Sequence, residues 1–67
     1  MTYNDNLKRL REEHNMSQAE VANALGVSTK SVSNWERGNK APSYANLICL
    51  ADLFLVTTDE ILGRRVK

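Results

Sequence analysis

The sequence predicts an all-α, compact five-helix domain. Apolar residues recur at three- and four-residue spacings along most of the chain, which is the period of a helix with one buried side. Serine, threonine and glycine residues suited to helix ends separate these segments, and no segment alternates as a half-buried strand does. A chain of 67 residues is typical of one small domain, and we expect that domain to span residues 1–67.

The first helix is expected from Asn4 to His14. Tyr3, Leu7 and Leu10 are spaced so that they share one side of this helix. We therefore expect this side to face the core of the domain, with the polar residues of the segment in solvent.

The second helix is expected to begin after Ser17, whose hydroxyl can accept a hydrogen bond from the helix N-terminus. Glu20 follows three residues later and completes an S-x-x-E capping box. The helix should end at Gly26, because the chain must turn sharply there and glycine takes positive φ at little cost. The residues expected on its inner side are Ala19, Val21, Ala22 and Leu25.

The third helix is expected between a second serine N-cap, Ser28, and Gly38. Its inner residues are Val27, Val32 and Trp35, and its outward residues are Thr29, Lys30, Ser33, Asn34 and Arg37. A short helix with an apolar back and a polar front suits insertion into the major groove of DNA. Residues of about 17–37 thus have the pattern of a helix-turn-helix, in which the small Ala22 lets the two helices approach closely.

The last two helices are expected within about residues 43–63. Ser43 can cap the fourth, whose inner residues are Leu47, Leu50, Ala51 and Phe54, with Ile48 nearby. Thr57 and Glu60 form a second capping box at the start of a short fifth helix that ends at Gly63.

The net charge gives only weak support to a nucleic-acid partner. Nine Lys and Arg against eight Asp and Glu leave +1, well below the charge of a strongly basic DNA-binding domain. The distribution is more favourable, since the charges between residues 26 and 49 are Lys30, Glu36, Arg37 and Lys40, and the tail adds Arg64, Arg65 and Lys67. We expect a locally basic face on a nearly neutral body, with modest non-specific affinity and a real dependence on a dimer.

The remaining composition argues against several functional classes. Cys49 is the single cysteine, so no intramolecular disulfide can form, and we expect its thiol to be packed against its apolar neighbours. His14 has no second histidine or cysteine at ligand spacing, so no metal site is expected. The sequence contains no glycine-rich phosphate loop and no nucleophile motif. We expect a protein that is not an enzyme and has no cofactor.

The location of the protein is expected to be cytoplasmic. The longest apolar stretch, residues 47–56, is interrupted by Asp52 and is too short to span a bilayer. The N-terminal residues lack the basic and apolar regions of a signal peptide.

From about Leu7 to Gly63 the chain resembles the phage repressor/Cro class of helix-turn-helix proteins, the xenobiotic-response-element family. The segments that carry the resemblance are Ser17-Gln18-Ala19-Glu20, the Gly26 turn, Trp35-Glu36-Arg37-Gly38, Pro42 and Asp59-Glu60-Ile61-Leu62-Gly63. The resemblance implies the lambda repressor-like DNA-binding fold. It also implies a structural pair between Arg11 in the first helix and Glu36 near the end of the third, beside the structural positions Ala22, Gly26, Val32 and Trp35.

The resemblance also assigns roles in DNA binding. Thr29, Lys30 and Ser33 fall on base-reading positions, and Asn34 on a base or phosphate position. Lys30 is the strongest specificity candidate, because lysine can donate to guanine O6 and N7. Phosphate contacts are implied for Gln18, which in similar proteins also braces the third helix, and for Arg37, Asn39 and Lys40. The competing interpretation of each residue is an ordinary solvated side chain.

Leu55 departs from the family pattern, which often has glycine or asparagine before the equivalent of Val56-Thr57. Either the turn differs here, or Leu55 accepts positive φ and places an apolar side chain outward. We expect a two-fold homodimer formed by the turn and the last helix, through Leu55, Val56, Ile61 and Leu62. The alternative is that Leu55 closes the core of the monomer.

These observations predict a sequence-specific transcriptional regulator, a repressor, that binds an inverted repeat in double-stranded DNA as a homodimer. One alternative is an antitoxin or another protein-interaction module that retains the fold and binds a protein partner. Another is a dimerisation domain that has lost DNA binding, which the low net charge allows.

Overall fold

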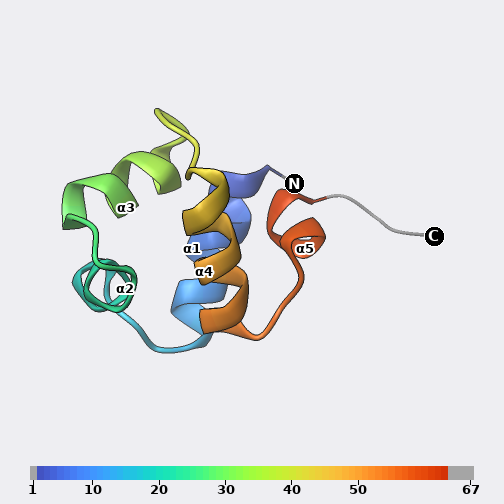
Figure 1. Ribbon diagram of the computed structural model, residues 1–67, viewed down its shortest axis with the longest axis horizontal. Coiled ribbons are helices and arrows are strands. Elements are labelled where there is room, and N and C mark those ends of the chain that lie inside the picture. The colour runs from blue at the N-terminus through green and yellow to red at the C-terminus, as the bar shows by residue number, and fades with distance from the viewer. Residues whose placement is uncertain (1, 64–67) are drawn as a thin grey trace.

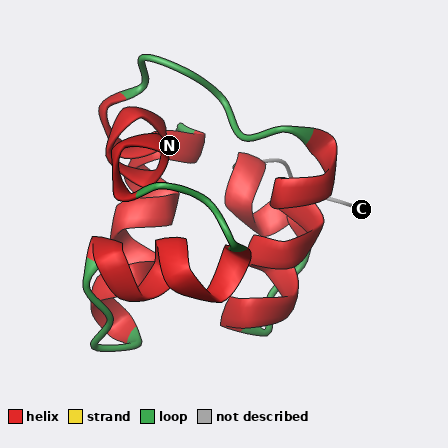
Figure 2. Ribbon diagram, turned by 60° about the vertical axis from the view of Figure 1, so that its left-hand side comes forward, coloured by secondary structure: helices red, strands yellow, loops and turns green. Residues whose placement is uncertain are grey.

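The computed structural model describes residues 2–63, and this range contains five helices and no strand (Figures 1 and 2). The helices are α1 (Tyr3–Glu13), α2 (Gln18–Leu25), α3 (Thr29–Arg37), α4 (Tyr44–Phe54) and α5 (Thr58–Leu62). The predicted all-α, five-helix fold is confirmed, with the first helix shifted by one residue because Thr2 caps its start. The basic tail residues Arg64, Arg65 and Lys67 lie outside the described residues.

The predicted caps explain why the helices begin and end where they do. Both capping boxes are present, Ser17 with Glu20 and Thr57 with Glu60. In the first box the Ser17 amide donates to Glu20 Oε1 over 2.8 Å, and the Glu20 amide donates to Ser17 Oγ over 3.0 Å. Gly26 ends α2 in the left-handed conformation, at φ 72°, which closes the helix without steric cost.

All five helices contribute side chains to one hydrophobic core. In Figure 1, α1 and α4 run through the middle of the molecule, α2 and α3 lie on one side of them, and α5 lies on the other. The buried apolar residues are Leu7, Leu10, Val21, Ala22, Val32, Trp35, Leu50, Ala51, Phe54 and Ile61. The radius of gyration of 10.7 Å matches the value of about 11 Å expected for a compact domain of this length.

Three apolar residues expected inside lie on the surface instead. Ala19 is exposed because each residue turns the helix by about 100°, which places Ala19 outside the arc covered by Val21, Ala22 and Leu25. On α4 the same rotation puts Cys49 opposite the buried residues, and both Cys49 and Ile48 are exposed. The expectation of a packed Cys49 thiol was therefore wrong.

Asn6 is a buried polar residue that joins α1 to α5. Its side chain is 2% exposed, and Nδ2 donates to the carbonyl oxygens of Glu60 over 3.2 Å and Ile61 over 3.0 Å. These carbonyls lie at the end of α5, where a helix leaves carbonyl groups without the usual intrahelical partners, although the Glu60 carbonyl also accepts from the Gly63 amide over 3.3 Å. Asn6 thus fastens α5, a helix of five residues, onto α1.

Within residues 2–63, no helix combines the length and the apolar character that a membrane crossing requires.

Candidate nucleic-acid interface

The α2–α3 pair forms one side of the molecule and is held from behind by the core. α3 packs against both α2 and α1, and its inner side chains Val32 and Trp35 are only 2% and 5% exposed. The turn between the helices passes through Gly26, and the Val27 amide donates to the Ala22 carbonyl over 3.0 Å. The predicted helix-turn-helix is therefore present, with Ala22 buried beside the turn.

The predicted base-reading side chains share the outward side of α3. At about 100° per residue they fall within an arc of about 140°, opposite Val32 and Trp35. Thr29, Lys30 and Arg37 are exposed, and Ser33 and Asn34 are half-buried. The structure thus brings these four side chains and the predicted phosphate contact Arg37 together on a single surface.

Local hydrogen bonds fix both ends of α3. At its start, the Ser28 hydroxyl accepts from the Ser31 amide over 3.1 Å. At its end, Gly38 adopts φ 79°, and the Asn34 carbonyl accepts from the amides of Asn39 at 3.0 Å and Lys40 at 3.4 Å. These bonds hold the backbone of Asn39 and Lys40 against the end of α3, and both residues are exposed there.

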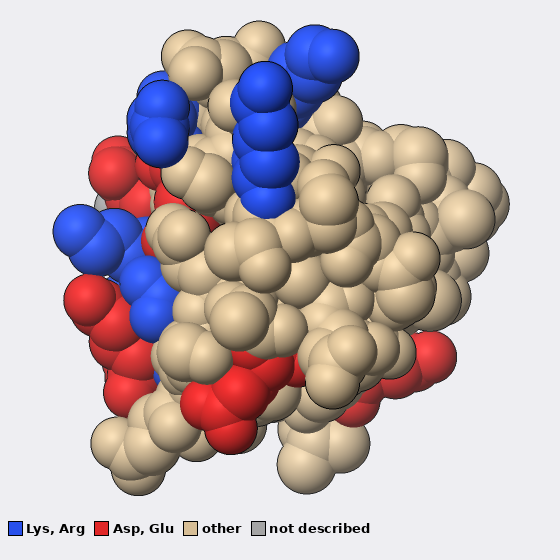
Figure 3. Space-filling model, turned by 90° about the vertical axis from the view of Figure 1, so that its left-hand side faces the viewer, with Lys and Arg blue, Asp and Glu red and all other residues tan. Residues whose placement is uncertain are grey.

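The charges are unevenly distributed over this side of the molecule. In Figure 3, Lys and Arg occupy its upper part and left edge, whereas Asp and Glu lie along the left edge and the lower part. Lys30, Arg37 and Lys40 are all exposed, and none of them takes part in an ion pair within the described residues. Three cations free to meet phosphate oxygens fit the expectation of a locally basic face.

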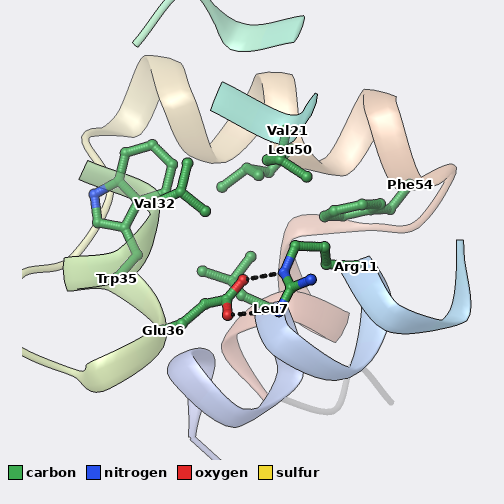
Figure 4. A pocket seen from close by; sticks show the side chains of 8 residues that line it. All are labelled: Leu7, Arg11, Val21, Val32, Trp35, Glu36, Leu50 and Phe54. Carbon is green, nitrogen blue, oxygen red and sulfur yellow. Dashed lines mark hydrogen bonds and ion pairs between the residues drawn. The ribbon is translucent and has the colours of Figure 1, made fainter. Parts of the chain in front are cut away.

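The predicted pair of Arg11 and Glu36 is confirmed and connects α1 to the end of α3 (Figure 4). Arg11 Nε donates to Glu36 Oε2 over 2.6 Å, and Nη2 donates to Oε1 over 3.1 Å, which is the two-point geometry that favours arginine over lysine. The third nitrogen, Nη1, donates to the Met16 carbonyl over 2.8 Å. Met16 enters only through its backbone oxygen, so its side-chain type gave no signal of this role in the sequence.

Gln18 joins the same network at the start of α2. Its Nε2 donates to Glu36 Oε1 over 3.1 Å, so the predicted bracing of α3 is present in the structure. A glutamine amide has two N–H groups, and the one not used by Glu36 leaves Gln18 able to donate to a phosphate as well. The Gln18 phosphate contact itself stays a prediction.

The ion pair is electrostatically strong because little solvent screens it. The side chains of Arg11 and Glu36 are 14% and 6% exposed. The hydrogen bond to Glu36 raises the pKa of Arg11, partial burial opposes this rise, and the nearby charges of Glu36 and Glu12 add to it. The guanidinium therefore stays charged, as arginine does in proteins generally.

The pocket in Figure 4 belongs to the core and not to a ligand site. Leu7, Val21, Val32, Leu50 and Phe54 form its apolar lining beside the ion pair. Its volume of about 10 Å³ is far below the range of roughly 300–1,000 Å³ of small-molecule sites. Among the described residues there is also no cluster of His, Cys, Asp and Glu suited to a metal ion.

The four residues expected at a dimer interface separate into two groups. Leu55 is 87% exposed at φ 57°, so it accepts the left-handed conformation and points outward, and Leu62 is 38% exposed. Ile61 is 0% exposed inside the monomer, so its assignment to the dimer surface is corrected, and Val56 is half-buried against the same core. The position of Ile61 follows from the anchoring of α5 onto α1, which turns this side chain inward.

Comparison with known proteins finds the helix-turn-helix in relatives of this chain. A helix-turn-helix family model matches residues 7–61. The transcriptional activator BcrR of Enterococcus faecalis is 39% identical over 63 residues, which cover 94% of this chain and 31% of BcrR. The transcriptional regulator AnsR of Bacillus subtilis is 42% identical over 60 residues, covering 90% of this chain and 52% of AnsR. The chain thus spans between about a third and a half of the length of these curated relatives.

A solved structure extends the similarity to three dimensions. The P22 c2 repressor protein, in a crystal structure with a synthetic operator, superposes with a TM-score of 0.91 at 25% sequence identity. The alignment covers 97% of this chain and 98% of the repressor chain.

Proposed function

The chain belongs to the helix-turn-helix family of the phage repressor/Cro type, and from this membership we propose that it is a sequence-specific transcriptional repressor that binds double-stranded DNA. The observation that carries the proposal is the outward side of α3, where Thr29, Lys30, Ser33, Asn34 and Arg37 share one surface. A rigid helix with polar side chains on its free side fits the width and the hydrogen-bonding pattern of the major groove.

Within this proposal, Thr29, Lys30 and Ser33 contact base edges and Asn34 contacts a base or a phosphate. Lys30 has the longest reach and, as a point charge with three donors, suits the two acceptors of guanine. Gln18, Arg37, Asn39 and Lys40 contact phosphates, which set position and affinity and carry no base information. The chain acts in this role by binding alone, without catalysis or a cofactor, in the cytoplasm.

The proposed functional unit is a homodimer on an inverted repeat. Leu55 supports this, since a large apolar side chain that is 87% exposed in a strained backbone conformation gains nothing within the monomer. Leu62 is exposed on α5, which follows the turn, and adds a second apolar side chain to the expected interface. A two-fold dimer would insert its α3 helices into successive major grooves about 34 Å apart.

Repression is proposed because occupancy of a promoter site by a small domain excludes other proteins from that site. The relative BcrR bears the name of an activator, and both outcomes begin with the same docking step. The alternative of an antitoxin-like module uses the exposed Leu55 surface for a different protein chain, with the fold unchanged.

The deciding experiment is selection of binding sites from randomised duplex DNA with the purified protein, at low and near-physiological salt. An enriched inverted repeat with half-sites about one helical turn apart is the expected result. Enrichment of a lone half-site would retain DNA recognition and remove the homodimer. No enrichment at either salt concentration would overturn the proposed function and direct the search to a partner protein.

A further inference from the structure

The outward side of α4 is apolar and uncovered. Tyr44, Ala45, Ile48, Cys49 and Asp52 are all exposed, and at about 100° per residue they lie within an arc of about 140° on this helix. Tyr44 is 79% exposed and Ile48 is 38% exposed. Asp52 is the only charge among the five, which is unusual for the solvent side of a surface helix.

Leu55 extends this side beyond the end of the helix. It is the C-cap of α4 and points into solvent. The six residues Tyr44, Ala45, Ile48, Cys49, Asp52 and Leu55 are called the α4 patch below. Exposed apolar surface that is continuous along one helix typically marks an interaction site.

We propose that the α4 patch binds a second copy of this chain, with the two α4 helices antiparallel and the two-fold axis passing beside Ile48. The inference deepens the homodimer proposed above and rests on it. It moves the centre of the interface from the α4–α5 turn and α5 to the outward side of α4.

In this arrangement, residues at one end of the α4 patch pair with chemically complementary residues at the other end of the partner's patch. Tyr44 and Asp52 lie four residues before and four residues after Ile48. An antiparallel pair centred at Ile48 therefore places the Tyr44 hydroxyl of each copy next to the Asp52 carboxylate of the other. The hydroxyl can donate to the carboxylate, so the one charge of the patch gains a hydrogen-bond partner at both ends of the interface.

The centre of the patch has the composition that close helix packing requires. Two copies of Ile48 meet at the axis, and the small Ala45 leaves room for the facing helix at the usual separation of about 8–10 Å between axes. Each Leu55 lies seven residues beyond Ile48 and reaches past the start of the partner's helix. Tyr44 and Leu55 thereby frame the interface with large apolar side chains.

The position of α3 favours the antiparallel over the parallel arrangement. In Figure 1, α4 runs roughly vertically in front of α1, and α3 lies to its left. A second copy in front of α4, related by a horizontal two-fold axis, has an antiparallel α4 and keeps its own α3 on the left. A vertical axis makes the α4 helices parallel and sends the two α3 helices to opposite sides, where they cannot reach one face of a duplex.

The single thiol of the chain provides a direct test. Cys49 follows Ile48, so the two Cys49 residues of the dimer would lie close to the axis and to each other. The wild-type protein is treated with a short bismaleimide at a concentration at which sedimentation detects dimer. Nearly complete conversion to a covalent dimer is the expected result. The matched control is Cys49→Ser combined with Lys8→Cys, which moves the thiol to an exposed position on α1 and should yield monomer.

The effects of substitutions in the α4 patch on dimerisation distinguish this surface from other possible dimer interfaces. Ile48→Asp should weaken dimerisation on the order of tenfold or more, because it places two carboxylates together at the axis. Tyr44→Phe removes only the hydroxyl and should weaken the dimer by a smaller factor. Leu55→Asn introduces a residue that tolerates positive φ, so the loss of dimer expected for this variant does not come from misfolding. Circular dichroism verifies the fold of each variant.

The possible outcomes distinguish a failure of the α4 interface from a failure of the proposed DNA binding. Dimer in sedimentation without a Cys49 cross-link, equal cross-linking of the Lys8→Cys control, or monomer only at high micromolar concentration would overturn the α4 interface. Site selection by such a protein would leave the proposed DNA binding intact, with a different interface or a lone half-site. A cross-linked dimer that selects no DNA would retain the α4 interface and remove the proposed function.

Discussion

Arg11 illustrates how strongly one residue determines the placement of the α3 surface. Replacing Arg11 by alanine would leave the Glu36 carboxylate buried without its counter-charge, and this is expected to lower the free energy of unfolding by about 3–5 kcal/mol. Single domains have a total stability of roughly 5–15 kcal/mol, so this loss is a large part of the total and should strongly lower the urea concentration at the midpoint of unfolding. Urea denaturation followed by the fluorescence of Trp35, the only tryptophan, measures the loss.

The control for this variant is a second arginine on the same helix. Arg9 pairs with Glu13 over 3.1 Å, but the two side chains are 44% and 56% exposed. Arg9→Ala should change the free energy of unfolding by less than about 0.5 kcal/mol, because solvent screens such a pair. Equal losses in the two variants would show that the Arg11–Glu36 pair gains nothing from burial.

Leu55 and Gly26 form a matched pair of residues with left-handed backbones, at φ 57° and φ 72°. A Cβ added to Gly26 would meet no atom within 4 Å, so Gly26→Ala measures conformational strain alone and should cost about 1 kcal/mol. Leu55→Gly relieves the same kind of strain and loses little buried area. At protein concentrations where only monomer is present, we expect an unchanged or slightly higher melting temperature for Leu55→Gly. A clear drop would mean that Leu55 makes contacts within the monomer.

Among the elements, α5 depends most on a single residue outside it. Asn6→Ala removes a donor from the Glu60 and Ile61 carbonyls. The Glu60 carbonyl keeps the Gly63 amide as a donor, so the expected cost of about 1–3 kcal/mol comes from the buried Ile61 carbonyl. Faster amide hydrogen exchange in residues 58–62 than in α2 is the expected signature, since five residues do not form a stable helix alone. Lys8→Ala on the exposed side of α1 is the control, and uniform protection loss over all helices would contradict a local role for Asn6.

The outward side of α3 contains two basic residues with different predicted roles, Lys30 in base reading and Arg37 in phosphate contact, and binding data should distinguish them. Lys30→Ala should lose about 1–3 kcal/mol of discrimination at one base pair, whereas Arg37→Ala should weaken binding to all sequences alike. Both residues are exposed, so neither variant should unfold the protein. Fluorescence anisotropy on the selected operator and on single-base variants measures both effects. A uniform loss for Lys30→Ala would refute its assignment as a base-reading residue.

Helix boundaries were largely predictable from sequence because caps are local. Ser17 with Glu20 and Thr57 with Glu60 lie three residues apart, so the chemistry that starts each helix is visible within one turn. The Arg11–Glu36 pair spans 25 positions and was found through the family pattern. Without that pattern, nothing in either residue's neighbourhood predicts the other.

The residues whose positions were missed or wrongly predicted are those that depend on packing between helices, which local sequence patterns do not encode. Asn6 meets α5 more than 50 positions away, and its only signal was a polar residue in phase with Tyr3 and Leu10. Cys49 has apolar neighbours in sequence, but the helix turns it away from the arc that α1, α2 and α5 cover. Ile61 was misplaced for the same reason, since its burial depends on where Asn6 fixes α5.

For the whole molecule, the low net charge limits how tightly one copy can hold DNA. Neutralisation of three or four phosphates per subunit by a dimer predicts that log K falls with log salt concentration at a slope of roughly −5 to −7. Titrations at several salt concentrations on the selected operator measure this slope. A value near about −3 would correspond to one subunit's contacts and would contradict binding as a dimer.

The two sides of α3 have consequences for how this protein can change over generations. Val32, Trp35 and Glu36 hold the helix in place from behind, while Thr29 and Lys30 are exposed. Substitutions on the free side are therefore nearly neutral for folding, and substitutions on the attached side are not. A lineage with this architecture can exchange one operator for another in a few mutational steps without passing through an unstable intermediate. Duplicated copies can in this way acquire separate targets while retaining the same scaffold.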